Sequence, residues 1–196
     1  PVLSEEGRDF PIAMPAKFWV VDPIDGTVNF ANGLLQYAIC VGLVEDGMFE
    51  SGVVCAPALD ELYFNLNADR AFLNGRPLEH IHRPLEDSLV AASFSANASP
   101  SCYTLFQQVN EATRGCLRTG SAALNICWAA SGKLQGAYGL DAKLWDVAGA
   151  LAISRAAGCE IALRYRPNTL TLDYCVGSRD AVRQIVDLAR KNGLWS

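Results

Sequence analysis

Two aspartates three positions apart, Asp22 and Asp25, are the first residues in this 196-residue chain whose types and spacing favour chemistry. They lie in the stretch 19–30, WVVDPIDGTVNF, where an apolar run predicts a strand that delivers Asp22 to its C-terminal end, so that Asp22 and Asp25 can converge on one point. The intervening proline stiffens the turn between them. Gly26 and Thr27 then add backbone amides and a hydroxyl suited to a phosphate oxygen, and hard oxygen ligands suit Mg²⁺. The competing interpretation is a surface turn, because Asp, Pro and Gly are ordinary turn residues.

Three weaker signals accompany this stretch. Asp146, in the run LWDVAGA, opens a helix rich in small residues, although an Asp in a first turn also caps a helix or complements its dipole. Glu5 belongs to a pair of adjacent glutamates, which alone is typical of a solvated surface. Gly120 and Ser121 form a turn that opens another helix, whose amides either meet an anion or are capped by Ser121.

The elements that must position these residues change character near residue 84. Before it, short apolar runs separated by tight turns predict an antiparallel sheet, and after it strands alternate with helices. The fold class is therefore mixed α and β, in two halves (residues 1–84 and 85–196) that share one interface. Strands are expected at 17–21, 37–44, 49–56, 61–64, 70–73, 89–94, 160–163 and 174–176, and helices at 103–112, 121–131, 145–157 and 179–192.

Composition excludes several classes of protein. The net charge of −5 argues against a nucleic-acid surface but not against phosphate, because metal cations can stand between carboxylates and an ester. No apolar run approaches the roughly 20 residues of a membrane span, and nothing at the start resembles a leader, so the cytoplasm is expected. The seven cysteines are scattered singly and predict buried thiols. His80 and His82 fall in a polar connection and predict solvated loop residues.

In combination and order, these four motifs resemble the inositol monophosphatase family of Mg²⁺-dependent, lithium-sensitive phosphatases, over nearly the whole chain. The resemblance implies a layered αβαβα sandwich of the inositol monophosphatase / fructose-1,6-bisphosphatase type, in the α+β or α/β class, and a homodimer. It also implies hydrolysis of a small phosphate monoester resembling inositol 1-phosphate, by attack of metal-activated water with no phosphoenzyme. The family opens with two helices and a strand pair before its Glu motif, so the resemblance predicts an N-terminally incomplete sandwich.

The resemblance also assigns roles to individual residues. Two or three Mg²⁺ ions are expected on the side chains of Glu5, Asp22, Asp25 and Asp146 and on the carbonyl of Ile24. The predicted catalytic residues are Thr27, Asp25 and Glu5. The predicted substrate-binding residues are Asp25, Gly26, Thr27, Gly120, Ser121, Ala122 and Asp146.

One position departs from the inositol-specific pattern. Such members carry a Glu seven positions before the second-motif Asp, and this chain has Gly139 there; Asp141 stands nearby at a different spacing. Histidinol phosphate, fructose 1,6-bisphosphate and 3′-phosphoadenosine 5′-phosphate therefore remain alternative substrates. A third hypothesis is a catalytically impaired family member that acts as a protein-binding module.

Overall fold

The computed structural model describes residues 1–7, 15–79, 82–166 and 169–195. Two sheets organise this part of the chain. Sheet A contains β1 (Val2–Ser4), β2 (Lys17–Asp25), β3 (Ala38–Glu45), β4 (Met48–Ala56), β5 (Glu61–Asn67), β6 (Arg70–Leu73) and β7 (Arg76–Pro77), in chain order. Sheet B has the order β11 (Glu160–Tyr165), β12 (Thr171–Gly177), β10 (Gly136–Lys143), β8 (Leu89–Ser93) and β9 (Gly115–Leu117). The helices are α1 (Thr27–Ala31), α2 (Pro100–Glu111), α3 (Ala122–Ala130), α4 (Leu144–Ala156) and α5 (Arg179–Lys191).

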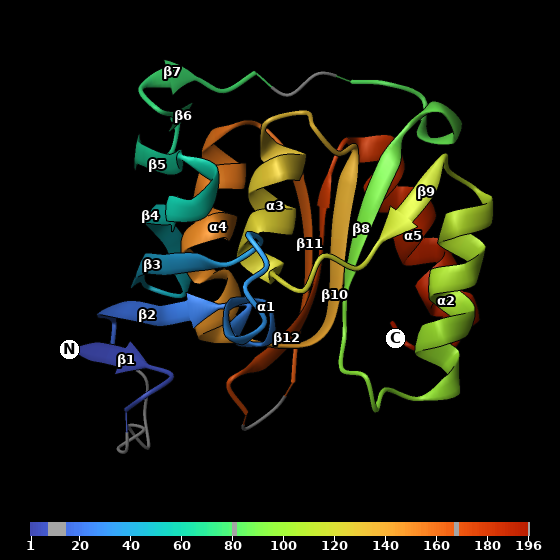
Figure 1. Cartoon of the computed structure of the whole chain (residues 1–196), viewed down its shortest axis with the longest axis horizontal. Helices are drawn as coiled ribbons and strands as arrows, with labels where there is room; N and C mark the ends of the chain where they lie inside the picture. Colours follow the sequence, from blue (N-terminus) through green and yellow to red (C-terminus); the bar gives the residue numbers. More distant parts are fainter. Residues whose placement is uncertain (8–14, 80–81, 167–168, 196) are drawn as a thin grey trace.

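Helices and sheets alternate as layers. Figure 1 shows sheet A, then α3 and α4, then sheet B, then α2 and α5 on the far side. This arrangement buries the apolar faces of both sheets against the α3–α4 layer, as two-sided packing requires. The predicted mixed αβ sandwich is confirmed. Among the described residues no helix covers the other face of sheet A, which exposes apolar side chains such as Trp19, Ile39, Val53 and Leu62.

Close contact between α4 and sheet A sets the position of the site. A Cβ built on Gly52 would stand 2.0 Å from the Gly149 carbonyl oxygen, and one on Gly42 would stand 2.6 Å from the Gly149 nitrogen. Glycine at these three positions therefore lets the α4 backbone rest directly on β3 and β4. As a result, the first turn of α4, which contains Asp146, is held near the carboxyl end of β2.

Several elements differ from the expected ones. The strand expected to stop before Asp22 continues to Asp25, because the backbone pairs again after an irregularity: Asp22 is opposite Cys40 and Asp25 is opposite Ala38. The helix expected to begin at residue 103 begins at Pro100, since proline is well suited to a first helical position. The strands β9 and β10 were not predicted at all, and β1 pairs with β2 in parallel within the otherwise antiparallel sheet A.

Other expectations concern single residues. All seven cysteines are free, and Cys55 and Cys159 are only partly buried. His82 is exposed as predicted, and His80 lies outside the described residues. The described helices are all too short or too polar to cross a bilayer.

Candidate active site

A strand irregularity brings Asp22 and Asp25 together. Side chains three residues apart on a regular strand point to opposite faces, but the register of β2 against β3 shifts between these two aspartates. The Asp22 carboxylate accepts a hydrogen bond from the Ile24 amide at 2.9 Å, which fixes the turn around Pro23. Both carboxylates are withdrawn from solvent, with 2% of Asp22 and 7% of Asp25 exposed.

The start of α3 holds Asp25 in place. The Ser121 hydroxyl donates to Asp25 Oδ2, and the amides of Ala123 and Ala122 donate to Oδ2 and Oδ1 at 2.8 and 3.2 Å. A carboxylate at a helix N-terminus is stabilised by these unpaired amides and by the helix dipole. Ser121 also caps the helix, because its oxygen accepts from the Leu124 amide at 3.2 Å. The Gly-Ser turn therefore acts on Asp25, while the predicted substrate contacts of Ser121 and Ala122 stay predictions.

Glu5 and Asp146 reach the same place from different elements. Parallel pairing of β1 with β2 sets Ser4 opposite Val21, and the Glu5 amide donates to the Val21 carbonyl at 3.2 Å. Asp146 stands in the first turn of α4, where its Oδ2 accepts from the Lys143 amide at 3.0 Å. The four carboxylates thus come from a parallel edge strand, the bulged β2 and a helix start.

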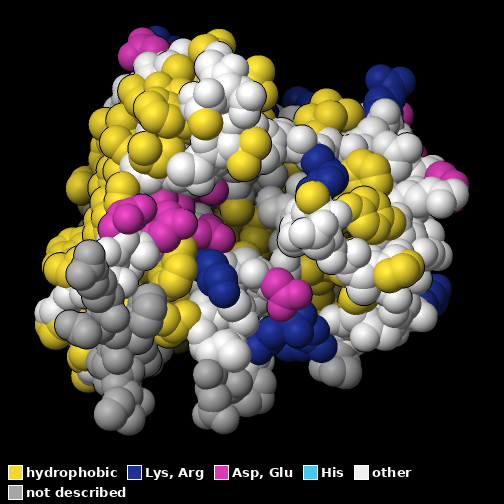
Figure 2. Space-filling model, turned by 60° about the horizontal axis from the view of Figure 1, so that its bottom comes forward, with side chains coloured by type: hydrophobic (Ala, Val, Ile, Leu, Met, Phe, Trp, Pro, Cys, Tyr) yellow, Lys and Arg dark blue, Asp and Glu magenta, His cyan; other side chains and the backbone are white. Residues whose placement is uncertain are grey.

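All four carboxylates border one cleft of about 310 Å³. Figure 2 shows acidic side chains gathered beside a hollow on this face, with Lys or Arg side chains across it. Of the predicted site residues, Ala122 and Ser121 alone are not among those that line this cleft. The lining residues are Glu5, Asp22, Ile24, Asp25, Gly26, Thr27, Val28, Gly120, Lys143, Trp145 and Asp146.

Burial and mutual repulsion disfavour the ionised form of the carboxylates at this site. Burial raises the pKa of Asp22 to about 8, with further increases from the charges of Asp25, Glu5 and Asp146. Burial raises the pKa of Asp25 to about 6 even though three hydrogen bonds oppose the shift, and burial with the Asp25 charge raises that of Asp146 to about 7. A cation among these groups would relieve both the desolvation and the repulsion.

The donor set fits a hard cation. The carboxylates and the Ile24 carbonyl that border the cleft are all oxygen donors, whereas thiols and imidazoles are absent from its described lining. No group of three or more His, Cys, Asp or Glu side chains in the described residues is arranged as a ready-made cage for one ion. Mg²⁺ is commonly held by one or two carboxylates together with waters and substrate phosphates, so an open arrangement is compatible with it.

Sequence reasoning missed a residue that joins the loops of the site. Asn29 is buried, and its Nδ2 donates to the Gln36 carbonyl at 2.6 Å and the Thr119 carbonyl at 2.7 Å. Gly120 packs against it with φ +89°, and a Cβ there would stand 2.6 Å from Asn29 Nδ2. The only available signal was the asparagine two positions after Thr27 in the first motif.

A second cavity continues from the carboxylates. It measures about 440 Å³, shares Asp25 and Asp146 with the cleft, and extends to Ser93, Arg118 and Asp141. Neither Ser93 nor Arg118 was predicted as a site residue, because their proximity to the aspartates depends on how β8 and β9 pair in sheet B.

The layered two-sheet sandwich places an acidic, oxygen-lined cleft where β2 and α4 meet, beside the start of α3. The chain belongs to the inositol monophosphatase family, whose model matches residues 2–184. That family consists of metal-dependent phosphatases that act on small phosphorylated substrates.

Individual relatives agree with this assignment. The chain is 34% identical over 160 residues to the inositol-1-monophosphatase of Rhizobium meliloti, covering 80% of this chain and 60% of that protein. It is 33% identical over 159 residues to the fructose-1,6-bisphosphatase/inositol-1-monophosphatase of Thermotoga maritima, covering 80% of this chain and 59% of that protein. Thus the chain spans less than two thirds of the length of these relatives.

Solved structures show the same architecture. The inositol monophosphatase of Anabaena superposes with a TM-score of 0.84 at 26% identity, covering 95% of this chain and 78% of that structure. Inositol monophosphatase II of Staphylococcus aureus superposes with a TM-score of 0.82 at 30% identity, covering 94% and 73%.

Proposed function

We propose that this chain carries the site of a Mg²⁺-dependent phosphatase that hydrolyses a phosphate monoester of a small metabolite. The observation that supports this most strongly is the convergence of Asp22, Asp25, Asp146 and Glu5 on one cleft, despite the electrostatic cost of keeping them together. The family to which the chain belongs supports the reaction class.

Mg²⁺ would be held by the carboxylates of Glu5, Asp22, Asp25 and Asp146 and by the Ile24 carbonyl. When bound, Mg²⁺ polarises phosphoryl oxygens and lowers the pKa of water that it coordinates. We also propose that Li⁺ inhibits this phosphatase activity.

The chain's own groups position the reactants. Thr27 is exposed at the start of α1, where its hydroxyl can orient the attacking water, and the Gly26 and Thr27 amides border the space for the phosphate. Ser121 keeps Asp25 fixed, so that its carboxylate cannot swing away from the cleft.

No cysteine is needed as a nucleophile. Cys40 is the cysteine that adjoins Asp25 and Asp22, and burial raises the pKa of its thiol, so the thiolate is disfavoured. Direct transfer of the phosphoryl group to water is therefore the reaction that we infer.

The residue at position 139 bears on the choice of substrate. A Cβ on Gly139 would stand 2.2 Å from Tyr174 Cε1, so the Tyr174 ring occupies the space that a side chain at 139 would need. Because position 139 then carries no inositol-contacting Glu, we propose a small phosphate monoester that resembles inositol 1-phosphate, with histidinol phosphate, fructose 1,6-bisphosphate and 3′-phosphoadenosine 5′-phosphate as alternatives. We further propose a cytoplasmic homodimer.

The second candidate function is a protein-binding module. The exposed apolar side chains of sheet A, among them Trp19, Ile39, Val53 and Leu62, favour it. Retention of every carboxylate in the cleft favours the enzyme instead.

The test is phosphate release by Asp25→Asn and Asp146→Asn, with Asp69→Asn as the matched control. Asp69 is exposed in the β5–β6 connection, so its loss removes the same charge outside the site. We expect at least a 100-fold loss of kcat in the two site variants, since each removes a carboxylate proposed to hold Mg²⁺, and less than a twofold change in the control. Equal rates in all three folded variants would refute the assignment.

A further inference from the structure

The second cavity, which extends from the proposed phosphate site, carries the hydrogen-bond donors Ser93 and Arg118 on the wall away from Asp25 and Asp146. It begins at Asp25 and Asp146 and passes between the ends of β8 and β10 to Arg118. In open sheets, the carboxyl ends of parallel strands gather ligand-binding groups, and Ser93 ends β8 while Arg118 directly follows β9.

Ser93 has its acceptor capacity filled. Its Oγ accepts from the Tyr174 hydroxyl at 3.2 Å and from Asn125 Nδ2 at 3.1 Å. The Asn125 amide is oriented by its Oδ1, which accepts from the Thr119 hydroxyl at 2.6 Å. A hydroxyl has two acceptor positions and one proton, so the remaining proton of Ser93 is available for donation. Because Ser93 lines the cavity, we expect that donor to serve a ligand.

Arg118 brings a positive charge to the same wall. Its guanidinium lies 4.3 Å from the centre of the Phe94 ring, and one Nη donates to the Phe94 carbonyl at 2.6 Å. These two contacts fix the side chain while leaving other N–H groups of the planar fork unused. Within the described part of the chain, Arg118 forms no ion pair.

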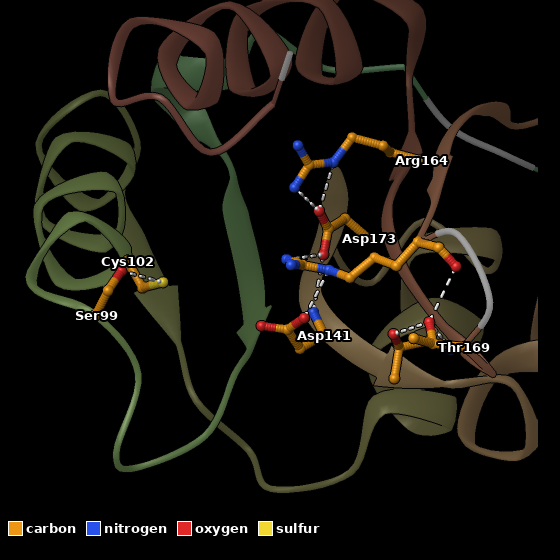
Figure 3. A network of polar contacts seen from close by, with 8 residues as sticks. Ser99, Cys102, Asp141, Arg164, Thr169 and Asp173 are labelled. Atoms are coloured by element: carbon orange, nitrogen blue, oxygen red, sulfur yellow. Dashed lines mark hydrogen bonds and ion pairs between the residues drawn. The ribbon is translucent and has the colours of Figure 1, made fainter.

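The acidic residue on this wall is already neutralised. Asp141 lines the cavity, and its carboxylate lies 2.6 Å from Arg166 Nε. Figure 3 shows Asp173 between Arg164 and Asp141: its Oδ2 pairs with Arg164 at 2.6 Å and its Oδ1 accepts from the Asp141 amide at 2.8 Å. Two arginines thus balance two aspartates, so the charge of Arg118 is the uncompensated one at this end of the cavity.

We propose that Arg118 and Ser93 form a subsite for a second anionic group carried by the leaving-group part of the substrate. This inference rests on the proposed phosphatase function and narrows its substrate class. One phosphate occupies the carboxylate cleft, and the alcohol that departs bears a further phosphate or a carboxylate that reaches Arg118.

Two matched substrate pairs test the subsite. Fructose 1,6-bisphosphate and fructose 1-phosphate differ by a second phosphate, and 3-phosphoglycerate and glycerol 3-phosphate differ by a carboxylate. The readout is the ratio of kcat/KM within each pair for wild type, Arg118→Gln, Arg118→Lys and Ser93→Ala. Arg114→Gln is the matched control: Arg114 is exposed beside β9, does not line the cavity, and loses the same charge.

The strength of a charge-assisted hydrogen bond sets the expected change in the kcat/KM ratio. We expect Arg118→Gln to lower the ratio for one pair by about 10- to 100-fold and Ser93→Ala by about 3- to 10-fold. Arg118→Lys should recover part of the loss, because it keeps the charge but not the fork. A change confined to the first pair assigns a phosphate, and one confined to the second assigns a carboxylate. Arg114→Gln should retain the wild-type ratios.

Equal ratios in wild type and Arg118→Gln would overturn the subsite while leaving the phosphatase assignment intact. Should wild type release no phosphate, calorimetry with fructose 6-phosphate, which carries only the second phosphate, decides the subsite separately. Binding that weakens at least tenfold in Arg118→Gln would support the subsite, and binding that is absent or unchanged in the variant would overturn it.

Discussion

Asparagine in place of Asp25 should remove a defined part of the pH dependence of stability in the metal-free protein. The Asp25 side chain is buried, and burial raises its pKa from the ordinary 3.8 to about 6. The folded state therefore holds the proton more tightly than the unfolded state does. Its contribution to stability is complete below the unfolded pKa and is lost as the pH rises through the folded pKa.

The magnitude follows from the size of the shift. Each pKa unit corresponds to about 1.36 kcal/mol, so Asp25 contributes about 2.5 kcal/mol to the fall in unfolding free energy between pH 4 and pH 8. In a chain of this length, that difference moves the melting temperature by about 5–10 °C. Asp22 and Asp146 have raised pKa values too, so they add to the same trend.

The assay is urea unfolding in the presence of a chelator at pH values from 4 to 8. Wild type and Asp69→Asn should lose stability as the pH rises, and Asp25→Asn should lose about 2.5 kcal/mol less over this range. The asparagine amide cannot accept all the hydrogen bonds from Ser121, Ala122 and Ala123, so absolute stability drops as well and only the slope is diagnostic. An undiminished slope in Asp25→Asn would refute the claim that its buried charge is costly.

Two further substitutions test how the site is supported. Gly52→Ala should destabilise the fold by about 3 kcal/mol in urea unfolding, because its Cβ would stand 2.0 Å from the Gly149 carbonyl oxygen. The control variant Gly136→Ala should cost under about 1 kcal/mol, because the nearest atoms to its Cβ lie 3.4 Å or more away. Similar costs for both would contradict the close contact between α4 and sheet A. Asp173→Asn should cost about 3–5 kcal/mol in the same assay, because it leaves Arg164 without its buried partner, while Asp187→Asn, in an exposed pair, should cost under about 1 kcal/mol. A loss under about 1 kcal/mol in Asp173→Asn would show that the ion pairs of Asp173 with Arg164 and Arg166 contribute little to the stability of the fold.

Local sequence signals placed Asp22 and Asp146 at the ends of secondary-structure elements, whereas their role as metal ligands came from the family resemblance and stays a prediction. The apolar run before Asp22 forms a strand, and the small residues after Asp146 form a helix that packs closely, so both carboxylates could be placed on element ends. The convergence of Glu5 with them depends on the parallel pairing of β1 with β2, which no local pattern encodes.

Other parts of the fold were missed for physical reasons. The strand β10 contains Gly136, Gly139 and the positive-φ residue Asp141, which obscure its periodicity, although neighbours on both sides bury it. Pro23 indicated the end of a strand, whereas the bulge allows β2 to continue past it. Ser93 belongs to no motif, and Arg118 only begins the stretch that contains the Gly120–Ser121 turn. What these two residues can bind depends on contacts with Tyr174, Asn125 and Phe94 that only the folded chain brings together.

Release of inorganic phosphate by the purified wild-type chain tests the central claim most directly. Histidinol phosphate, fructose 1,6-bisphosphate, 3′-phosphoadenosine 5′-phosphate and inositol 1-phosphate would each be supplied with Mg²⁺, with a chelator, and with Mg²⁺ plus Li⁺. We predict release from at least one substrate that stops with the chelator, returns when Mg²⁺ is added back, and falls with Li⁺. Release that continues undiminished in the chelator would contradict a metal-dependent site built from Glu5, Asp22, Asp25 and Asp146.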